Sequence, residues 1–445
     1  MATVDDMSSG SAVMWFRRDL RVRDNPALLA ALQDGPATGL FVIDPILWAA
    51  AGPGRRAWLA ANVLALGREI PLTIRYGDPV DVVPQMADGD LVHVSAETTP
   101  YGRSRDVAVG RRVQLVATGS PYAVGPGLVT NGSGEPYQVF SAFARAWRSH
   151  GWSAPAEAPS SPGLVPADSD PRAVELLEQA LADAPFELPD AGEEGAWRRW
   201  RAFRDHDLAG YPTERDRPDH DGTSRLSPYL HLGVLHPRSL LADLEPTSTY
   251  ATELGWRDFY ADVLWHSPAS AWSDLRPGLS AMSYDDPEDV VEAWRTGTTG
   301  YPIVDAGMRQ LREIGWMHNR VRMITASFLT KDLHVYWTVG ARHFLSLLID
   351  GDVASNNHGW QWVAGTGTDA SPYFRVFNPV TQGKKFDPDG DYVRRWVPEL
   401  AHLRGAAAHE PWKSDVGYEG GYPMRIVDHA DERAEALRRY QAART

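Results

Sequence analysis

Short apolar runs alternate with longer mixed stretches over the first third of the chain. The apolar runs predict strands at Ser11 to Phe16, Gly39 to Ile43, Leu72 to Tyr76 and Leu91 to Val94. The intervening stretches predict helices at Asn25 to Leu32 and at Arg55 to Leu66. Strands that alternate with helices indicate a doubly wound, Rossmann-like parallel sheet. We therefore expect an α/β domain at residues 11–135.

The pattern changes twice after this domain. Residues 136–190 include a stretch rich in Pro, Ala, Ser and acids, which predicts an interdomain connector with one helix from Pro171 to Asp183. From Gly192 onward, helical patterns are separated by Gly and Pro, and no strand series is visible. We therefore expect an all-α domain at residues 191–445.

Composition narrows the classes of protein. The chain has no Cys, which excludes disulfides, thiolate metal sites and a catalytic thiol. Its start lacks the pattern of a secretory signal, and no apolar stretch reaches the roughly 18 residues that a membrane span needs. We expect a cytoplasmic protein with no membrane association.

Charge and tryptophan content give mixed indications of whether the protein binds nucleic acid. The net charge of −14 argues against a phosphate-binding protein. However, Arg309 to His343 holds six bases and two acids, which leaves a local basic face possible. The 17 tryptophans exceed what core packing alone usually explains.

The segment Gly222 to Pro228, GTSRLSP, has two interpretations. In the first interpretation, the segment is an anion site formed by its hydroxyl groups, its Arg and the start of the following helix. In the second, a Ser or Thr simply caps the helix that starts near Pro228. Local evidence favours the cap.

Two further segments carry polar groups on one helical face. Glu253, Trp256, Arg257 and Tyr260 share a face, which suits either a flat polar ligand or an amphipathic helix. Asn319, Arg320 and Met323 share another, with Arg322 pointing elsewhere, although core packing is the usual role of Met.

Asp350 and Asp352 flank a glycine, but no His or Cys stands at ligand spacing, so we expect no metal. Trp360 and Trp362 follow closely and cannot share a helical face.

These segments together resemble the DNA photolyase and cryptochrome family. The resemblance is carried by GTSRLSPYL, ELGWRDFY, GWMHNRVRMIT, DGDVASNNHGWQW, GTGTDASPYFR and FNPVTQGK, and in the front domain by VMWFRRDLRVRDNP and FVIDP. It implies a helical domain that binds FAD. The residues that it assigns to the flavin are Tyr211, Thr223, Ser224, Arg225, Leu226, Ser227, Tyr250, Arg257, Arg322, Asp350, Gly351, Asp352 and Asn356.

Within this family, the segments are most similar to the class I enzymes that repair cyclobutane pyrimidine dimers. The resemblance implies light-driven electron transfer from reduced FAD, FADH−, to a dimer flipped out of DNA. Asn319 and Met323 replace the histidine pair of enzymes for (6-4) photoproducts. The residues that it assigns to DNA are Arg215, Glu253, Trp256, Asn319, Arg320, Met323, Trp362, Arg375 and Gln382.

The resemblance also assigns residues to the chemistry. Glu253 hydrogen-bonds the dimer, Asn356 lies beside flavin N5, and Trp360 and Trp337 carry electrons. The third carrier is Tyr284, where relatives have Trp, and His358 stands where relatives have Gly.

The front domain is implied to hold an antenna chromophore. Tyr101-Gly102 stands where folate-type enzymes have Asn-Glu, which favours 8-hydroxydeazaflavin over methenyltetrahydrofolate. A cryptochrome-type photoreceptor and a (6-4) photolyase remain alternatives. We expect a monomer that acts on DNA containing pyrimidine dimers.

Overall fold

A computed structural model describes residues 11–159, 163–279, 282–285, 287–368 and 375–443. Contacts divide the chain into two compact units that alternate along the sequence. Unit 1 comprises residues 1–129, 147–201 and 225–265, and unit 2 comprises residues 130–146, 202–224 and 266–445.

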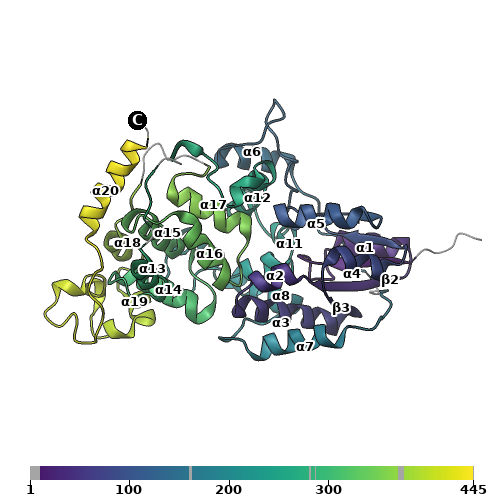
Figure 1. Cartoon of the computed structure of the whole chain (residues 1–445), viewed down its shortest axis with the longest axis horizontal. Helices are drawn as coiled ribbons and strands as arrows, with labels where there is room; N and C mark the ends of the chain where they lie inside the picture. Colours follow the sequence, from purple (N-terminus) through teal and green to yellow (C-terminus); the bar gives the residue numbers. More distant parts are fainter. Residues whose placement is uncertain (1–10, 160–162, 280–281, 286, 369–374, 444–445) are drawn as a thin grey trace, which may run out of the picture. The chain divides into compact units, whose positions relative to one another are not determined.

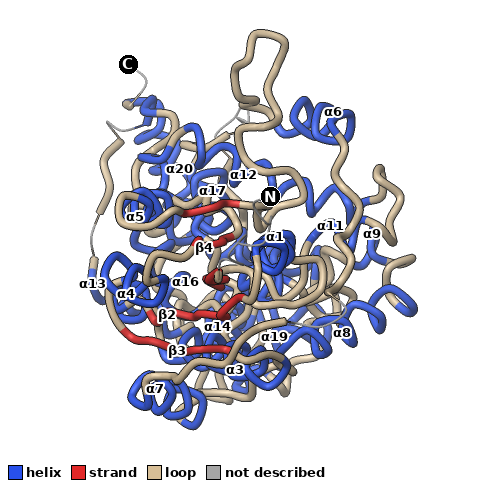
Figure 2. The backbone as a smooth tube through the Cα atoms, turned by 90° about the vertical axis from the view of Figure 1, so that its right-hand side faces the viewer, coloured by secondary structure: helices blue, strands red, loops and turns tan. Residues whose placement is uncertain are grey.

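Unit 1 is built on a five-stranded parallel sheet of order β3-β2-β1-β4-β5 (Figures 1 and 2). Every side chain of β1 is buried, as expected for the central strand of a sheet covered on both faces. The strands are β1 (Ala12–Phe16), β2 (Ala37–Ile43), β3 (Leu72–Tyr76), β4 (Leu91–Val94) and β5 (Leu115–Ala117). The expected Rossmann-like fold is confirmed, and β5 is the strand that the sequence pattern missed.

Helices cover the sheet and begin at a repeated signal, a Pro in the first turn that follows a capping residue. Caps at Asn25, Asp44, Asp78, Thr99 and Asp170 each accept a hydrogen bond from a backbone N–H two or three residues on. The helices are α1 (Pro26–Asp34), α2 (Pro45–Ala50), α3 (Pro53–Glu69), α4 (Pro79–Ala87), α5 (Pro100–Gly110) and α7 (Pro171–Ala182). α7 packs against α3 and β3.

Unit 1 also takes in residues that the sequence pattern assigned to the all-α domain. They form α10 (Ser227–Leu232), α11 (Pro237–Leu241) and most of α12 (Thr249–His266). Buried Asp258 of α12 accepts hydrogen bonds from Val124 N–H and Trp147 Nε1, at 3.0 and 2.9 Å. These bonds fasten α12 to the loop after β5 and to helix α6 (Phe140–His150), a long-range connection that no local sequence pattern carries.

Unit 2 is helical in its described residues. Two helices, α6 (Phe140–His150) and α8 (Gly192–His206), cross from one unit to the other, and α6 lies in the expected connector. The α-helices that lie wholly in unit 2 are α9 (Tyr211–Glu214), α13 (Glu288–Thr296), α14 (Pro302–Ile314), α15 (Asn319–Ser327), α16 (Trp337–Leu347), α17 (Val353–Ala364), α18 (Pro379–Phe386), α19 (Asp391–Trp396) and α20 (His429–Ala442). One π-helical turn, η3 (Phe328–Asp332), continues α15.

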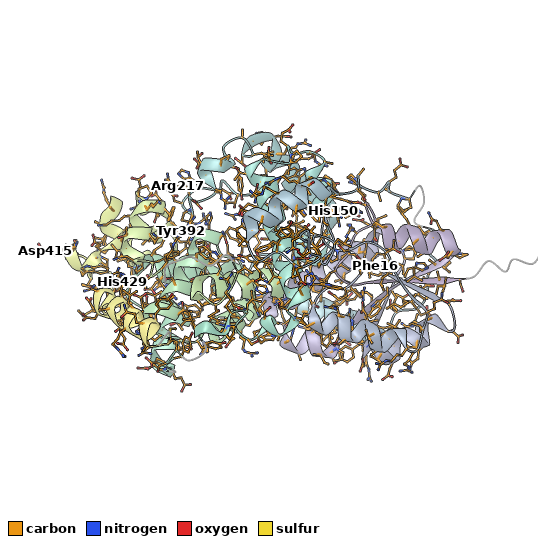
Figure 3. The ribbon with its side chains drawn as sticks, turned by 90° about the horizontal axis from the view of Figure 1, so that it is seen from above. Phe16, His150, Arg217, Tyr392, Asp415 and His429 are labelled. Carbon is orange, nitrogen blue, oxygen red and sulfur yellow. The ribbon has the colours of Figure 1, made fainter. Side chains whose placement is uncertain are left out.

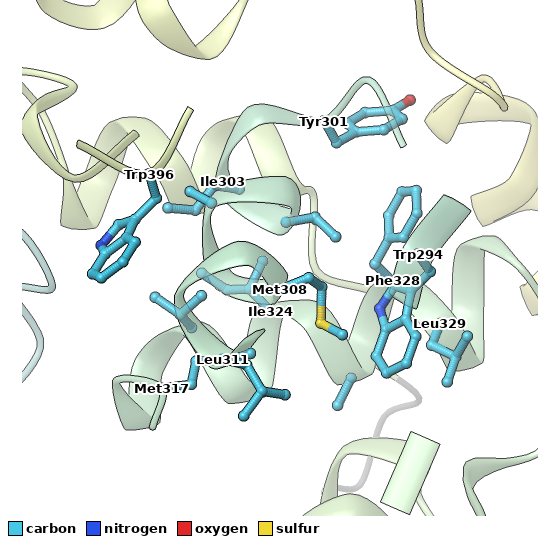
Figure 4. Close-up of a cluster of buried hydrophobic side chains, with 14 of the residues drawn as sticks. Trp294, Tyr301, Ile303, Met308, Leu311, Met317, Ile324, Phe328, Leu329 and Trp396 are labelled. Carbon is cyan, nitrogen blue, oxygen red and sulfur yellow. The ribbon is translucent and has the colours of Figure 1, made fainter. Parts of the chain in front are cut away.

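The core of unit 2 gathers aromatic and aliphatic side chains from α13 to α17 and from α19, and Figure 4 shows a part of it that includes Trp294 of α13 and Trp396 of α19. Trp294, Trp337 and Trp360 are all buried there. α20 is held to η3 at its first residue, where His429 (labelled in Figure 3) contacts Asp332 at 2.5 Å. No described helix is long and apolar enough to cross a membrane.

Candidate functional site

Helix α17 and the turn before it hold four of the residues predicted to contact a flavin, which are Asp350, Gly351, Asp352 and Asn356. Asp352 caps it by accepting a hydrogen bond from Ser355 N–H at 2.9 Å. The helix is fixed along one side by Gln361, whose Nε2 donates to Ser270 O at 2.7 Å and whose Oε1 accepts from Leu275 N–H at 2.8 Å. The direction of the remaining side chains of α17 is therefore set by the segment around residues 270–275.

An ion pair precedes this helix. Arg322 of α15 donates from Nη2 to Asp350 Oδ2 at 2.8 Å and from Nε to Met317 O at 2.8 Å. Asp350 and Asp352 are both buried, so two carboxylates that are close in sequence are shielded from solvent. Within the described part of the chain, no group of three or more His, Cys, Asp or Glu could hold a metal ion.

Asn356 presents an amide next to these acids. Its Nδ2 donates to Ala341 O at 3.2 Å and to Asn357 Oδ1 at 2.8 Å. Both amide hydrogens of Asn356 are already used in hydrogen bonds. Its Oδ1 is therefore the atom that can accept a hydrogen bond from a ligand.

Trp360 and Trp362 point in different directions, as their spacing requires. Trp360 is buried and packs in a T-shaped contact on Phe344, with ring centroids 5.0 Å apart, and on Trp294 at 6.0 Å. Trp362 is partly exposed. The structure thus separates a buried indole from an accessible one on the same helix.

A second aromatic group surrounds Trp337, at the start of α16. Trp337 Nε1 and the Tyr336 hydroxyl both donate to Asp274 Oδ1, each at 2.8 Å. Tyr336 lies 5.0 Å from Tyr284 between ring centroids. The sequence predicted Trp337 and Tyr284, but it gave no reason to select Asp274 or Tyr336.

Helix α15 carries the strip predicted to contact DNA. Arg320 and Met323 lie on one face, with Arg320 Nη1 3.7 Å from Met323 Sδ, and Asn319 is exposed. Arg320 forms an ion pair with Asp216 at 2.8 Å and lies over the Phe386 ring at 4.4 Å. The guanidinium that was expected to face DNA therefore has an acidic partner.

The basic side chains of the segment Arg309 to His343 are less available to bind DNA than its composition indicates. Arg309 pairs with Glu399 at 2.7 Å, and Arg342 lies over the Trp272 ring at 4.1 Å. Lys331 is buried and donates to Ala364 O at 2.7 Å, and its burial lowers its pKa well below the usual value. Much of the expected basic face therefore serves internal contacts.

Four other predicted residues of unit 2 lie outside the contacts described so far. Tyr211 is buried against Phe203, with ring centroids 5.7 Å apart, and Arg215 lies over the Tyr211 ring at 5.8 Å. Gln382 is partly buried on α18. Arg375 is exposed, and residues 369–374 of its motif lie outside the described residues.

The predicted face of α12, in unit 1, is exposed in part. Glu253, Trp256, Arg257 and Tyr260 are all partly accessible, and Trp256 contacts Tyr260 with ring centroids 5.4 Å apart.

Two residues predicted to bind the cofactor make contacts inside unit 1. Arg257 donates to Pro121 O at 2.8 Å and to Leu230 O at 3.0 Å. Tyr250 is buried against Trp200, with ring centroids 5.6 Å apart.

The GTSRLSP segment crosses the boundary between the units, after Ser224. Its helix, α10, begins at Ser227, and Leu226 stands at the cap position without a side-chain hydrogen bond. The interpretation of a Ser or Thr cap is therefore wrong. Arg225 has a left-handed backbone, with φ of 51°, which is uncommon outside Gly. Thr223 is partly accessible, and Ser224 is buried.

A separate polar group lies at the carboxyl ends of β1 and β4, where the strand order of the sheet reverses. Ligands of doubly wound sheets bind at such positions. Arg17 pairs with Asp106 at 2.6 Å, and the guanidinium groups of Arg17 and Arg105 lie over the Trp15 ring at 4.7 and 4.9 Å. The Tyr101 hydroxyl donates to Asp44 at 2.6 Å, and burial raises the pKa of Tyr101.

Comparison with known proteins identifies the family of this chain. Residues 250–442 match the FAD binding domain of DNA photolyase, and residues 12–162 match the DNA photolyase domain. A protein named deoxyribodipyrimidine photo-lyase from Escherichia coli strain K12 is 40% identical, over 97% of this chain and 98% of its own length. The chain belongs to the DNA photolyase family.

Solved structures of photolyases and cryptochromes have the same fold. A class III photolyase from Agrobacterium tumefaciens is 34% identical, with a TM-score of 0.88, over 100% of this chain and 99% of its own. A cryptochrome from Synechocystis sp. PCC6803 is 27% identical, with a TM-score of 0.87, over 96% and 98%. The resemblance found in the sequence is confirmed.

Proposed function

We propose that this photolyase-family protein is a deoxyribodipyrimidine photo-lyase, which repairs cyclobutane pyrimidine dimers in DNA by light-driven electron transfer from FAD. The observation that carries the proposal is the division of α15 between two tasks. Arg320 and Met323 form one face with Asn319 at its start, while Arg322 of the same helix reaches Asp350. One short helix thus presents the proposed lesion contacts and supports the proposed flavin contacts.

The donor set of unit 2 fits a flavin. Asp350 and Asp352 are carboxylates suited to the hydroxyl groups of a ribityl chain, and Arg322 offsets one of the two charges. Asn356 Oδ1 can accept a hydrogen bond from the N5–H group, which a reduced flavin has and an oxidised flavin lacks. When bound and reduced, FAD supplies the photo-excited electron that opens the cyclobutane ring.

The chain's own residues would hold the dimer. Trp256 and Trp362 are partly accessible indoles, which suit stacking on bases that have left the duplex. Glu253 lies one turn before Trp256 on α12 and would accept hydrogen bonds from the base edge. Arg215, Arg375 and Gln382 would contact the DNA backbone.

Electron entry would follow the buried aromatics. Trp360 lies within the core of unit 2, Trp337 starts the neighbouring helix α16, and Tyr284 is the proposed outermost residue. Thr223, Ser224, Arg225, Leu226 and Ser227 would supply backbone and hydroxyl donors to the FAD diphosphate.

The antenna proposal rests on Gly102. A Cβ at this position would lie 2.0 Å from Glu97 Cγ, so a glutamate there would displace the existing one. A folate-type Asn-Glu pair would therefore require the Glu97 side chain to move, and we favour 8-hydroxydeazaflavin. Mass measurement of the chromophores released from purified protein tests the choice, and methenyltetrahydrofolate as the released species would contradict it.

The activity is tested with oligo(dT) that contains cyclobutane dimers. The reduced protein should remove dimers under blue light and not in darkness. The Glu253→Ala variant should bind the substrate and repair it more slowly. Equal dimer loss in light and darkness, or none in either, would refute the proposal.

A cryptochrome-type photoreceptor is the second candidate, because the Synechocystis cryptochrome has nearly the same fold. That function predicts flavin photochemistry without loss of dimers. We also propose that the protein acts as a monomer in the cytoplasm, which sedimentation and cell fractionation would test.

A further inference from the structure

One carboxylate joins the two aromatic side chains at the start of α16. Asp274 Oδ1 accepts from the Tyr336 hydroxyl and from Trp337 Nε1, each at 2.8 Å. The rings of Tyr336 and Trp337 are also in contact, with centroids 5.9 Å apart. The phenol of Tyr336, which can be oxidised, therefore contacts both Trp337 of the proposed electron path and the carboxylate of Asp274.

Tyrosine oxidation at neutral pH requires loss of the phenolic proton as well as an electron. Burial and the hydrogen bond to Asp274 raise the pKa of Tyr336 to about 12, so the proton is present before oxidation. Asp274 can take it without any movement of heavy atoms, because the hydrogen bond already exists.

The neighbouring Tyr284 lacks this arrangement. Its hydroxyl is buried and has no hydrogen-bond partner among the described residues. Burial raises the pKa of Tyr284, and the nearby Asp274 charge acts in the same direction. Removal of an electron from Tyr284 would leave its proton without an acceptor, which makes this oxidation the costlier of the two.

We propose that Tyr336, with Asp274 as its proton acceptor, is the first tyrosine oxidised in the electron path of this protein. The inference rests on the proposed function, because it requires that photo-excited oxidised flavin withdraw an electron from Trp337 through Trp360. Tyr284 is then a later relay or a bystander.

The step balances in atoms and charge. The Trp337 radical cation takes one electron from Tyr336 and becomes neutral tryptophan. The Tyr336 O–H bond breaks, and its proton moves to Asp274 Oδ1, which gives a neutral tyrosyl radical and a carboxylic acid. A thiol reductant from solution later returns a hydrogen atom to the radical, and Asp274 releases its proton to solvent.

The arrangement has a consequence for the lifetime of the separated charges. Return of the electron requires return of the proton, so recombination is slower than from a tryptophan radical cation alone. Asp274 is partly accessible, so the proton can leave toward solvent and the radical can wait for an external reductant.

Flash excitation of the flavin-loaded protein tests the proposal, with absorption and electron paramagnetic resonance reporting which radical forms. The wild type and the Tyr284→Phe variant should give a tyrosyl radical. The Tyr336→Phe variant should lose it, and so should Asp274→Asn, which keeps a hydrogen-bond acceptor but removes the base. Loss of the signal in Tyr284→Phe and its retention in Tyr336→Phe would overturn the proposal.

A second measurement needs no variant. In the wild type, the tyrosyl signal should rise more slowly in deuterated water, because a proton moves with the electron. Equal rise rates in the two solvents would overturn the coupled step. Failure of the proposed function is recognised separately, as intact dimers after illumination of the reduced protein.

Discussion

The indole of Trp360 packs directly on Gly340. A Cβ built on this glycine would lie 2.2 Å from Trp360 Cη2 and 2.6 Å from Leu329 Cδ2. Gly340 stands one turn after Trp337 on α16, so the absence of a side chain brings the buried tryptophan of α17 against the helix that carries Trp337. The close approach of these helices therefore requires glycine at position 340.

Gly340→Ala should therefore displace the Trp360 ring. Overpacking of this kind costs about 1–3 kcal/mol of unfolding free energy, which urea denaturation would measure. Photoreduction of oxidised flavin should slow as well, because the aromatic contacts of Trp360 shift.

A matched control lies on α17 itself. A Cβ at Gly359 would meet nothing within 4 Å, so Gly359→Ala should be neutral or stabilise the helix by up to about 1 kcal/mol. Equal unfolding free energies for the two variants would show that Gly340 is not constrained by Trp360.

The ion pair of Arg320 with Asp216 leads to a prediction about DNA binding. If Arg320 contacts a phosphate in the complex, then Asp216 competes with the DNA for it. Asp216→Asn should tighten DNA binding and steepen its salt dependence by about 0.9 in the logarithmic slope for one added phosphate contact. Fluorescence anisotropy with a labelled oligonucleotide at several salt concentrations measures both effects.

Asp391→Asn is the control for that measurement. It breaks an exposed pair with Arg394, which is outside the predicted DNA contacts of the same unit. Binding should change little in this variant. An unchanged slope in Asp216→Asn would remove Arg320 from the phosphate contacts.

Local patterns predicted the elements of the sheet well. The expected strand from Leu72 to Tyr76 is β3, and the expected strand from Leu91 to Val94 is β4. β5 was not predicted because it is only three residues long, Leu115–Ala117, which is too short to give a strand pattern. The grouping of α12 with the sheet was also beyond local patterns, since it depends on hydrogen bonds from Val124 and Trp147, which are more than 100 residues away, to Asp258.

Prediction of the candidate site from the sequence was limited in the same way. Motifs and their resemblance to the photolyase family selected Asp350, Asn356 and Trp360. Asp274 and Asp216 lie in no such motif, and their importance comes from partners about 60 and 100 residues away in sequence. Sequence patterns locate groups that act together locally, whereas the partner of a charged or phenolic group is decided by tertiary contacts.

Trp256 provides a test of the proposed lesion contacts. Stacking of a flipped base on an indole contributes about 1–3 kcal/mol, so Trp256→Ala should weaken binding of dimer-containing DNA by that amount. Undamaged DNA should bind with little change, because its bases stay stacked. Trp272→Ala removes a more exposed indole outside the predicted contacts and serves as the control. Equal losses for damaged and undamaged DNA would argue against stacking on the dimer.

His358 makes the stability of unit 2 depend on pH. Burial lowers the pKa of His358 from 6.5 to about 4, and its Nε2 lies 3.4 Å from Ser270 Oγ. Between these two values the unfolded chain binds a proton that the folded protein does not, so stability falls as the pH falls. From about pH 7.5 to about pH 5, this residue should cost about 2 kcal/mol of unfolding free energy.

The His358→Asn variant isolates this contribution. Relative to the wild type, the unfolding free energy of this variant should rise by about 2 kcal/mol on acidification. Burial also lowers the pKa of His236, His343 and His409, but these residues are present in both proteins and cancel in the difference. His150→Gln, at an exposed position of α6, should show no such change. A stability difference that stays constant between the two pH values would mean that His358 takes up its proton over the same pH range in the folded protein as in the unfolded chain.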